Sequence, residues 1–122
     1  MAGIRTIVLS IGIGLAPSFY VMVVEHILLP RFEADFGFRG GRVSVDHPEA
    51  PYPRYAIIGV TPGGRLEQAG VRSGDVPVDY HQGLVVFYVA LRDVSEGKSG
   101  EFMVVSKDEP PWDKRRTIKL SP

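Results

Sequence analysis

The histidines are the side chains best suited to acid–base or metal chemistry in this chain. His47 directly follows an aspartate, and His81 lies two positions after Asp79. Either pair could suggest a catalytic dyad or a set of metal ligands. Neither pair is accompanied by the Gly-x-Ser-x-Gly pattern of a serine nucleophile or the His-Glu-x-x-His pattern of a zinc peptidase. We therefore interpret both histidines as solvated loop residues and predict neither a catalytic residue nor a metal site.

Other classes of chemistry are also disfavoured. The chain has no cysteine, which excludes a thiol nucleophile, disulfides and thiolate metal sites. Gly97-Lys98-Ser99 resembles the end of a phosphate-binding loop, but Arg92 stands where that loop needs its first glycine. Lys and Arg together number 14, as do Asp and Glu, so the net charge is zero. A nucleic-acid-binding protein needs an excess of basic side chains. We predict a protein that is not an enzyme, has no cofactor and binds no nucleic acid.

The hydrophobic residues are concentrated at the N-terminus, where no charged residue occurs from Thr6 to Val24. As a helix this run would be about 29 Å long, close to the hydrocarbon thickness of about 30 Å. A signal peptide is an alternative, but its best cleavage site, after Ala16, is followed by Pro17. A buried helix is a second alternative, although a small domain could hardly cover a helix that is apolar all round. We favour an uncleaved transmembrane anchor.

The charges that flank this run predict its orientation. Arg5 and the free amine precede it, which places the N-terminus in the cytoplasm by the positive-inside tendency. We therefore expect a single-pass membrane protein whose membrane contact is made by residues 6–24. Residues 1–30 form the anchor in this interpretation, and residues 31–122 form a domain outside the cytoplasm, in the periplasm if the protein is bacterial.

The remaining chain has the pattern of strands, turns and two helices. Alternating or β-branched residues predict strands, and glycine after a short polar segment predicts a helix end. The expected strands are 42–45, 55–60, 71–78, 101–106 and 116–120, and the expected helices are 65–69 and 84–94. For residues 84–94 a strand is an alternative, because the valines lower helix propensity. Pro77 lacks an N–H, so we expect its strand to be an edge strand or to carry a bulge. The pattern predicts a mainly β fold with two helices, a small β-sandwich or barrel capped by helices and preceded by one transmembrane helix.

The stretch from Val60 to Val76, VTPGGRLEQAGVRSGDV, resembles the signature of PDZ domains. That family's pattern is V-x-P-G-(G/S)-x-A-x-x-A-G-(L/V)-x-x-G-D-x-(I/L). A second motif, Phe36-Gly37-Phe38, resembles the hydrophobic-Gly-hydrophobic loop that precedes the peptide-binding strand of the family. The following Arg39 also fits. The resemblance extends over nearly the whole soluble part and is greatest to the bacterial periplasmic, protease-associated type.

The resemblance implies a groove that binds the C-terminus of a peptide. Backbone N–H groups of the loop would hold the carboxylate, while a strand edge pairs with the peptide backbone. A helix would supply the pockets, and many family members have a histidine at its start. Our alignment places Val85 there, which favours an apolar ligand side chain. The residues expected to bind the peptide are Phe36, Gly37, Phe38, Arg39, Val85 and Val89.

Three functions remain open at this point. The first is a membrane-tethered peptide-binding module that recognises protein C-termini or extended segments and acts as a scaffold or regulator. The second is the regulatory part of a membrane protease system. The third is a structural assembly protein whose groove is filled by side chains and does not bind peptides. The sequence does not predict the oligomeric state.

Overall fold

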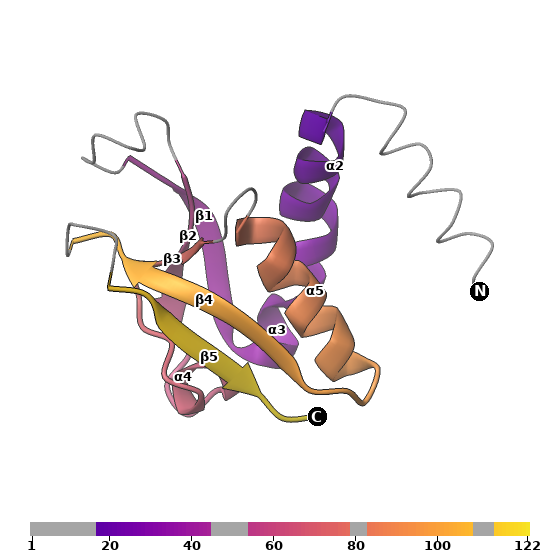
Figure 1. Ribbon diagram of the computed structural model, residues 1–122, viewed down its shortest axis with the longest axis vertical. Helices are drawn as coiled ribbons and strands as arrows, with labels where there is room; N and C mark the ends of the chain where they lie inside the picture. The colour runs from indigo at the N-terminus through magenta and orange to yellow at the C-terminus, as the bar shows by residue number, and fades with distance from the viewer. Residues whose placement is uncertain (1–16, 45–53, 79–82, 109–113) are drawn as a thin grey trace.

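The computed structural model describes residues 17–44, 54–78, 83–108 and 114–122 (Figure 1). The N-terminal helical elements are α2 (Pro17–Val23), η1 (Val24–Leu28), η2 (Leu29–Phe32) and α3 (Glu33–Phe36). The other elements are β1 (Phe38–Val43), β2 (Arg54–Val60), α4 (Arg65–Gln68), β3 (Asp75–Val78), α5 (Gly83–Ser95), β4 (Gly100–Ser106) and β5 (Arg116–Leu120).

The strands form one antiparallel sheet in the order β1-β2-β3-β4-β5. The strands β1 and β5 are its edges, and β1 has no strand partner on its outer side among the described residues. Helix α5 packs on one face of the sheet, and the N-terminal helical elements lie next to α5 (Figure 1). The expectation of a mainly β fold with helices is confirmed at this level.

The strand β1 begins earlier than the sequence pattern indicates, at Phe38 rather than at residue 42. The sequence pattern misses the start of β1 because Gly40 and Gly41 lie in it and glycine has low strand propensity. Gly40 is nevertheless required, since a Cβ there would lie 2.0 Å from the hydroxyl oxygen of Tyr55. A bulge adds Ile58 to β2 opposite β1, which lets Ile57 and Val60 both point into the core.

The strand β3 lies in the middle of the sheet and not at its edge, contrary to the expectation from Pro77. It pairs with β4 along its whole length, but with β2 only where Ile57 meets Asp75. Beyond that pair, β3 has no ladder partner on the β2 side among the residues that the structure describes. Pro77 is therefore accommodated as it would be in an edge strand, because no partner there requires its missing N–H.

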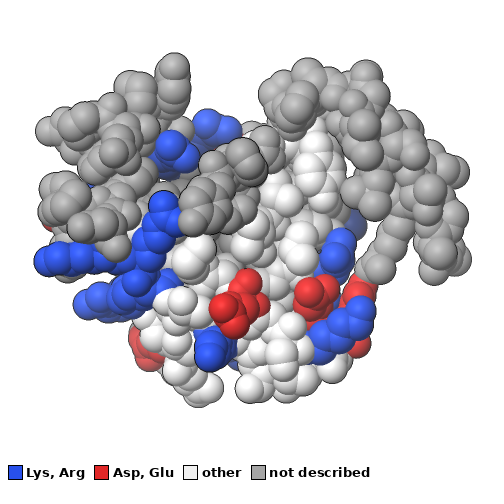
Figure 2. All heavy atoms as spheres, viewed as in Figure 1, with Lys and Arg blue, Asp and Glu red and all other residues white. Residues whose placement is uncertain are grey.

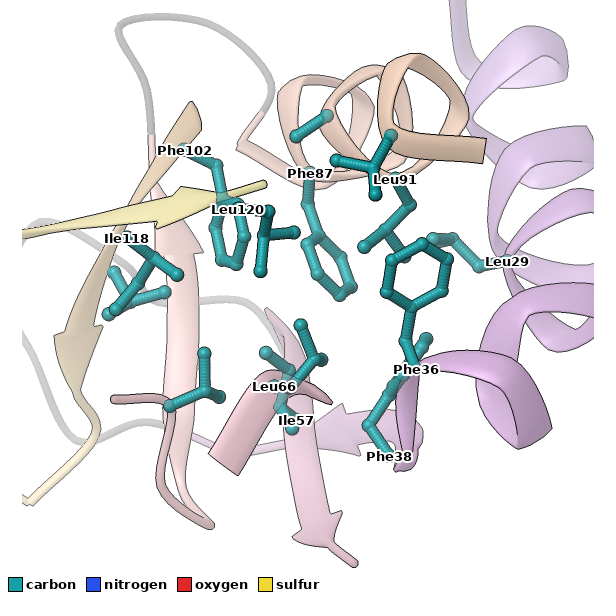
Figure 3. Packing of buried hydrophobic residues seen from close by; sticks show 14 of the residues in the cluster. Leu29, Phe36, Phe38, Ile57, Leu66, Phe87, Leu91, Phe102, Ile118 and Leu120 are labelled. Atoms are coloured by element: carbon teal, nitrogen blue, oxygen red, sulfur yellow. The ribbon is translucent and has the colours of Figure 1, made fainter. Parts of the chain in front are cut away.

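The main core lies between α5 and the sheet (Figure 3). Phe87 points from α5 toward the sheet, and its ring packs against the rings of Phe38 and Phe102 at centroid distances of 5.3 and 4.8 Å. Leu66 and Ile118 complete it from α4 and β5. A smaller cluster on the opposite face of the sheet is built from Ala56, Val76 and Val105.

The N-terminal helical segment belongs to this same core. Val24 and Leu29 are fully buried in it, so the expected domain boundary after Pro30 falls inside the packed region. Pro30 cannot donate the hydrogen bond of a regular α-helix, and the winding changes from π to 3-10 around it.

The expected transmembrane helix is not supported by this arrangement. Within residues 17–44 and the other described ranges, no helix is long and apolar enough to cross a membrane. Residues 6–16 of the uncharged run lie outside the described residues. Its described part forms α2 and ends at the buried Val24.

Candidate functional site

The Phe36-Gly37-Phe38 motif forms a turn between α3 and β1. Gly37 adopts a left-handed conformation, with φ 71° and ψ 61°, and ends α3. Its carbonyl accepts a hydrogen bond from the Thr61 N–H at 3.0 Å. A Cβ on Gly37 would lie 3.1 Å from Gly64 Cα and 3.2 Å from Thr61 Cβ. The turn is thus packed against the start of the Val60–Val76 motif, and glycine is required there for both conformation and space.

The outer edge of β1 presents backbone N–H groups away from the sheet. Gly40 N–H points to this edge, because its nearest acceptor is a carboxylate oxygen of Glu33 and not a β2 carbonyl. Arg42 follows two positions later and therefore directs its N–H the same way. Such an edge can pair with an added strand.

One side of α5 faces this edge and the N-terminal segment. Leu84 and Tyr88 lie one turn apart on that side and pack on the core, and the fully buried Leu91 follows. Val85 and Val89 are half-buried and take no part in the core cluster. At about 100° per residue they project away from Phe87.

The predicted site residues therefore fall into two groups. Phe36, Gly37 and Phe38 come together at the start of β1, next to Leu91 of α5 (Figure 3). Arg39 is exposed on the opposite face of β1. Val85 and Val89 do not join the first group, because they point away from the sheet; Leu84, Tyr88 and Leu91 occupy the groove side of α5 instead. The helical spacing places these three residues on one face, whereas the resemblance to the family implied the valines.

The space between β1 and α5 is occupied by the chain itself. The fully buried Leu29 points toward the ring of Phe36 and toward Leu91 (Figure 3). Phe32 packs against the rings of Phe36 and Tyr88, with centroids 5.6 and 6.1 Å apart. These contacts fill the space beside the Phe36–Phe38 turn with apolar side chains of the chain itself.

Polar groups of the same segment bind the strand. Glu25 is only 7 % exposed, and its carboxylate accepts a hydrogen bond from Arg42 Nε at 3.0 Å. His26 Nε2 lies 2.8 Å from that carboxylate. A Glu33 carboxylate oxygen lies 3.5 Å from Gly40 N, and the Glu33 carbonyl accepts the Gly37 N–H at 2.9 Å. The amide expected to hold a ligand carboxylate is thus already bonded within α3.

Tyr55 lies under this polar cluster. It is 8 % exposed, and within the described residues its hydroxyl has no hydrogen-bond partner. Burial raises the pKa of Tyr55 well above its ordinary value, and the carboxylates of Glu33 and Glu25 raise that pKa further. The hydroxyl therefore remains protonated beside the groove at physiological pH.

The Val60–Val76 motif has a structural role rather than a place in the groove. Asp75, 1 % exposed, accepts hydrogen bonds from the Arg72 N–H and from the guanidinium of Arg116. Arg116 also donates to the carbonyl of Gly70 at 3.0 Å. These bonds join β5 to the turn that follows α4 and fix the sheet behind the site.

Other features of the described surface lie away from the groove. A hollow of about 310 Å³ is lined by α4 and the end of β5, including Arg65 and Lys119. Basic side chains gather at the hairpin end of β4 and β5, at the left of the view, while the centre of that face is mostly uncharged (Figure 2). His47 and His81 lie outside the described residues. Within the described ranges, no group of His, Asp and Glu side chains could hold a metal ion.

Compared with known protein families, the chain matches no family model, and no curated protein is similar to it. The resemblance to PDZ domains therefore stays a prediction based on the quoted motifs.

Proposed function

We propose that this chain is a PDZ-like peptide-binding module that captures the C-terminus of a partner protein along β1. The observation that carries the proposal is the buried Phe36–Phe38 turn opening directly into an edge strand opposite an apolar side of α5. A peptide added there would exchange backbone hydrogen bonds with β1. Its last side chain would enter the pocket between Phe36 and Leu91, and the module would act as a scaffold or regulator of its partner.

A screen of random peptides with free C-termini for binding to the full chain tests this proposal. Selected peptides should end in an aliphatic residue. Amidation of the terminal carboxylate and N-methylation of alternate peptide bonds should each weaken binding by tenfold or more, because each removes groups that bond to the turn or to β1. The control Lys119→Glu, in the hollow at α4 and β5, should leave affinity unchanged. Peptides that bind equally well when amidated, or that respond only to Lys119→Glu, would locate binding elsewhere.

We further propose that the uncharged run attaches the module to a membrane, with the N-terminus cytoplasmic and the domain outside the cytoplasm. If residues from Tyr20 onward remain packed on the domain, Thr6 to Phe19 would span only about 21 Å as a helix, short of a bilayer core. A full span through Val24 therefore requires that residue to leave the core. Retention in the membrane fraction after a carbonate wash would support attachment, and complete release would argue against it.

A structural assembly protein is the second candidate, and the burial of Val24 and Leu29 in the groove favours it. In that case the N-terminal segment is a permanent part of the core. The two candidates differ in whether the segment can leave the groove while the rest of the domain stays folded. A protease-regulating role would depend on the same peptide binding, and the protease would be another chain.

A further inference from the structure

Each recognition element of the proposed groove is already satisfied by the segment from Val24 to Glu33. Leu29 fills the apolar pocket, Glu25 pairs with Arg42, and the Glu33 carboxylate approaches the Gly40 N–H. The Glu33 carbonyl takes the Gly37 N–H. A peptide that uses these same groups has to displace the segment.

The segment also runs in the direction that a ligand would take. Glu25 contacts Arg42 near the end of β1, whereas Glu33 contacts Gly40 closer to its start. The segment is thus antiparallel to β1, and it descends toward the Phe36–Phe38 turn, where a ligand's carboxylate would lie. The segment is helical, and from it Glu25 and Leu29 occupy places that an acidic and an aliphatic ligand side chain would take.

We infer that the segment Val24–Glu33 is an intramolecular occupant of the groove, and that a ligand replaces it with an aliphatic last residue and an upstream carboxylate for Arg42. This inference rests on the proposed function. A segment closed over the groove lowers apparent affinity in proportion to the fraction of open molecules. Weakening its contacts therefore raises affinity without any change in the pocket.

The spacing of the ligand carboxylate follows from strand geometry. Phe38, Gly40 and Arg42 point to the same face of β1, since side chains alternate along a strand. An antiparallel peptide whose last residue lies opposite Phe38 places the residue four positions earlier opposite Arg42. That residue should be acidic, because Arg42 then exchanges Glu25 for a ligand carboxylate.

The test uses the full chain in detergent micelles and two labelled peptide pools, X-X-X-X-Glu-X-X-X-Leu and X-X-X-X-Lys-X-X-X-Leu. Glu25→Arg places two cations together and should raise affinity for the glutamate pool by tenfold or more. Ile27→Arg places the same cationic side chain on the solvent side of the segment, where Ile27 is 48 % exposed, and should change nothing. Arg42→Glu should also open the groove, and it should reverse the preference in favour of the lysine pool. Circular dichroism verifies that each variant is folded, and Leu29→Ser provides a second opening variant if Glu25→Arg unfolds.

The outcomes distinguish a failure of the intramolecular occupant from a failure of the proposed peptide-binding function. Peptide binding that is equal in the wild-type chain, Glu25→Arg and Ile27→Arg overturns the intramolecular occupant and leaves the proposed function standing. Binding that increases in Glu25→Arg without a charge reversal in Arg42→Glu overturns the role of Arg42 in ligand choice. Folded variants that bind neither pool overturn the proposed function, and the inference falls with it.

Discussion

Replacement of Gly40 by alanine should be strongly destabilising, because the strand beside the groove has no room for a methyl group. The new Cβ would lie 2.0, 2.5 and 2.8 Å from the Oη, Cζ and Cε2 atoms of Tyr55. Carbon atoms at optimal separation are about 3.5–4.0 Å apart, so the ring has to move by more than about 1 Å. Tyr55 is buried and packs near Phe87, at a centroid distance of 6.2 Å, which restricts that movement.

Overpacking of a core typically costs about 1–3 kcal/mol, and three close contacts place Gly40→Ala near the upper end, at about 3 kcal/mol. Urea unfolding followed by circular dichroism measures the loss. In a Tyr55→Leu background the clashing atoms are absent, and the same substitution should cost less than about 1 kcal/mol. Gly59→Ala in the paired strand is the control, since its Cβ would meet nothing closer than 3.8 Å. An equal loss in the wild-type chain and in the Tyr55→Leu background would refute the reasoning.

Three further predictions concern the same framework. Asp75→Ala should lower the free energy of unfolding by about 3 kcal/mol, because the Arg72 N–H and the partly buried Arg116 guanidinium lose their acceptor. Tyr55→Phe should be neutral or stabilising by about 1 kcal/mol at pH 7, since it removes a buried hydroxyl that has no partner among the described residues. Wild-type stability should fall relative to this variant above pH 10, by up to about 1.4 kcal/mol per pH unit, because only unfolded Tyr55 then releases its proton. Gly37→Ala should cost about 1 kcal/mol more than Gly63→Ala, which has a similar positive φ but open space around it.

Each of these predictions has a result that would contradict it. For Asp75, both hydrogen bonds go to the same carboxylate oxygen, Oδ2, and an Asn amide oxygen in that place can still accept them. Asn should therefore lose less stability than Ala, and equal losses would argue against the hydrogen bonds. For Tyr55, parallel pH profiles of the wild-type chain and the phenylalanine variant would exclude a raised pKa. For Gly37, a cost equal to that of Gly63→Ala would mean that contact with Gly64 and Thr61 is unimportant.

The sequence predicted the elements that rely on local signals. The strands β2, β4 and β5 and the helices α4 and α5 were found because their β-branched runs, helical spacing or terminal glycines are read within a few residues. Asp75 lies in the stretch that resembles the family signature, but its partner Arg116 could not be predicted, since the two residues are brought together only by the folded sheet. Nothing local in the sequence indicates such a pair.

The groove was predicted only in part, for a physical reason. The Phe36–Phe38 turn and the strand after it could be inferred from the motif, whereas its occupant could not. An uninterrupted apolar run ending at Val24 is typical of a membrane span, and the same hydrophobicity also suits burial against α5. Glu25 after that run indicates the end of a span, yet in the fold it is buried and paired with Arg42. That partner lies 17 residues away in sequence, so no local pattern indicates the pair.

We propose that the β1–α5 groove is the binding surface and that residues 24–33 fill it in the free chain. Titration of the ¹⁵N-labelled full chain in micelles with the X-X-X-X-Glu-X-X-X-Leu pool tests this most directly. The account predicts that the amide signals of Gly40, Arg42 and Leu91 shift together, while those of residues 24–33 move toward unstructured positions. Shifts confined to the hollow around Arg65 and Lys119, or signals of residues 24–33 that stay fixed while the groove amides shift, would contradict it.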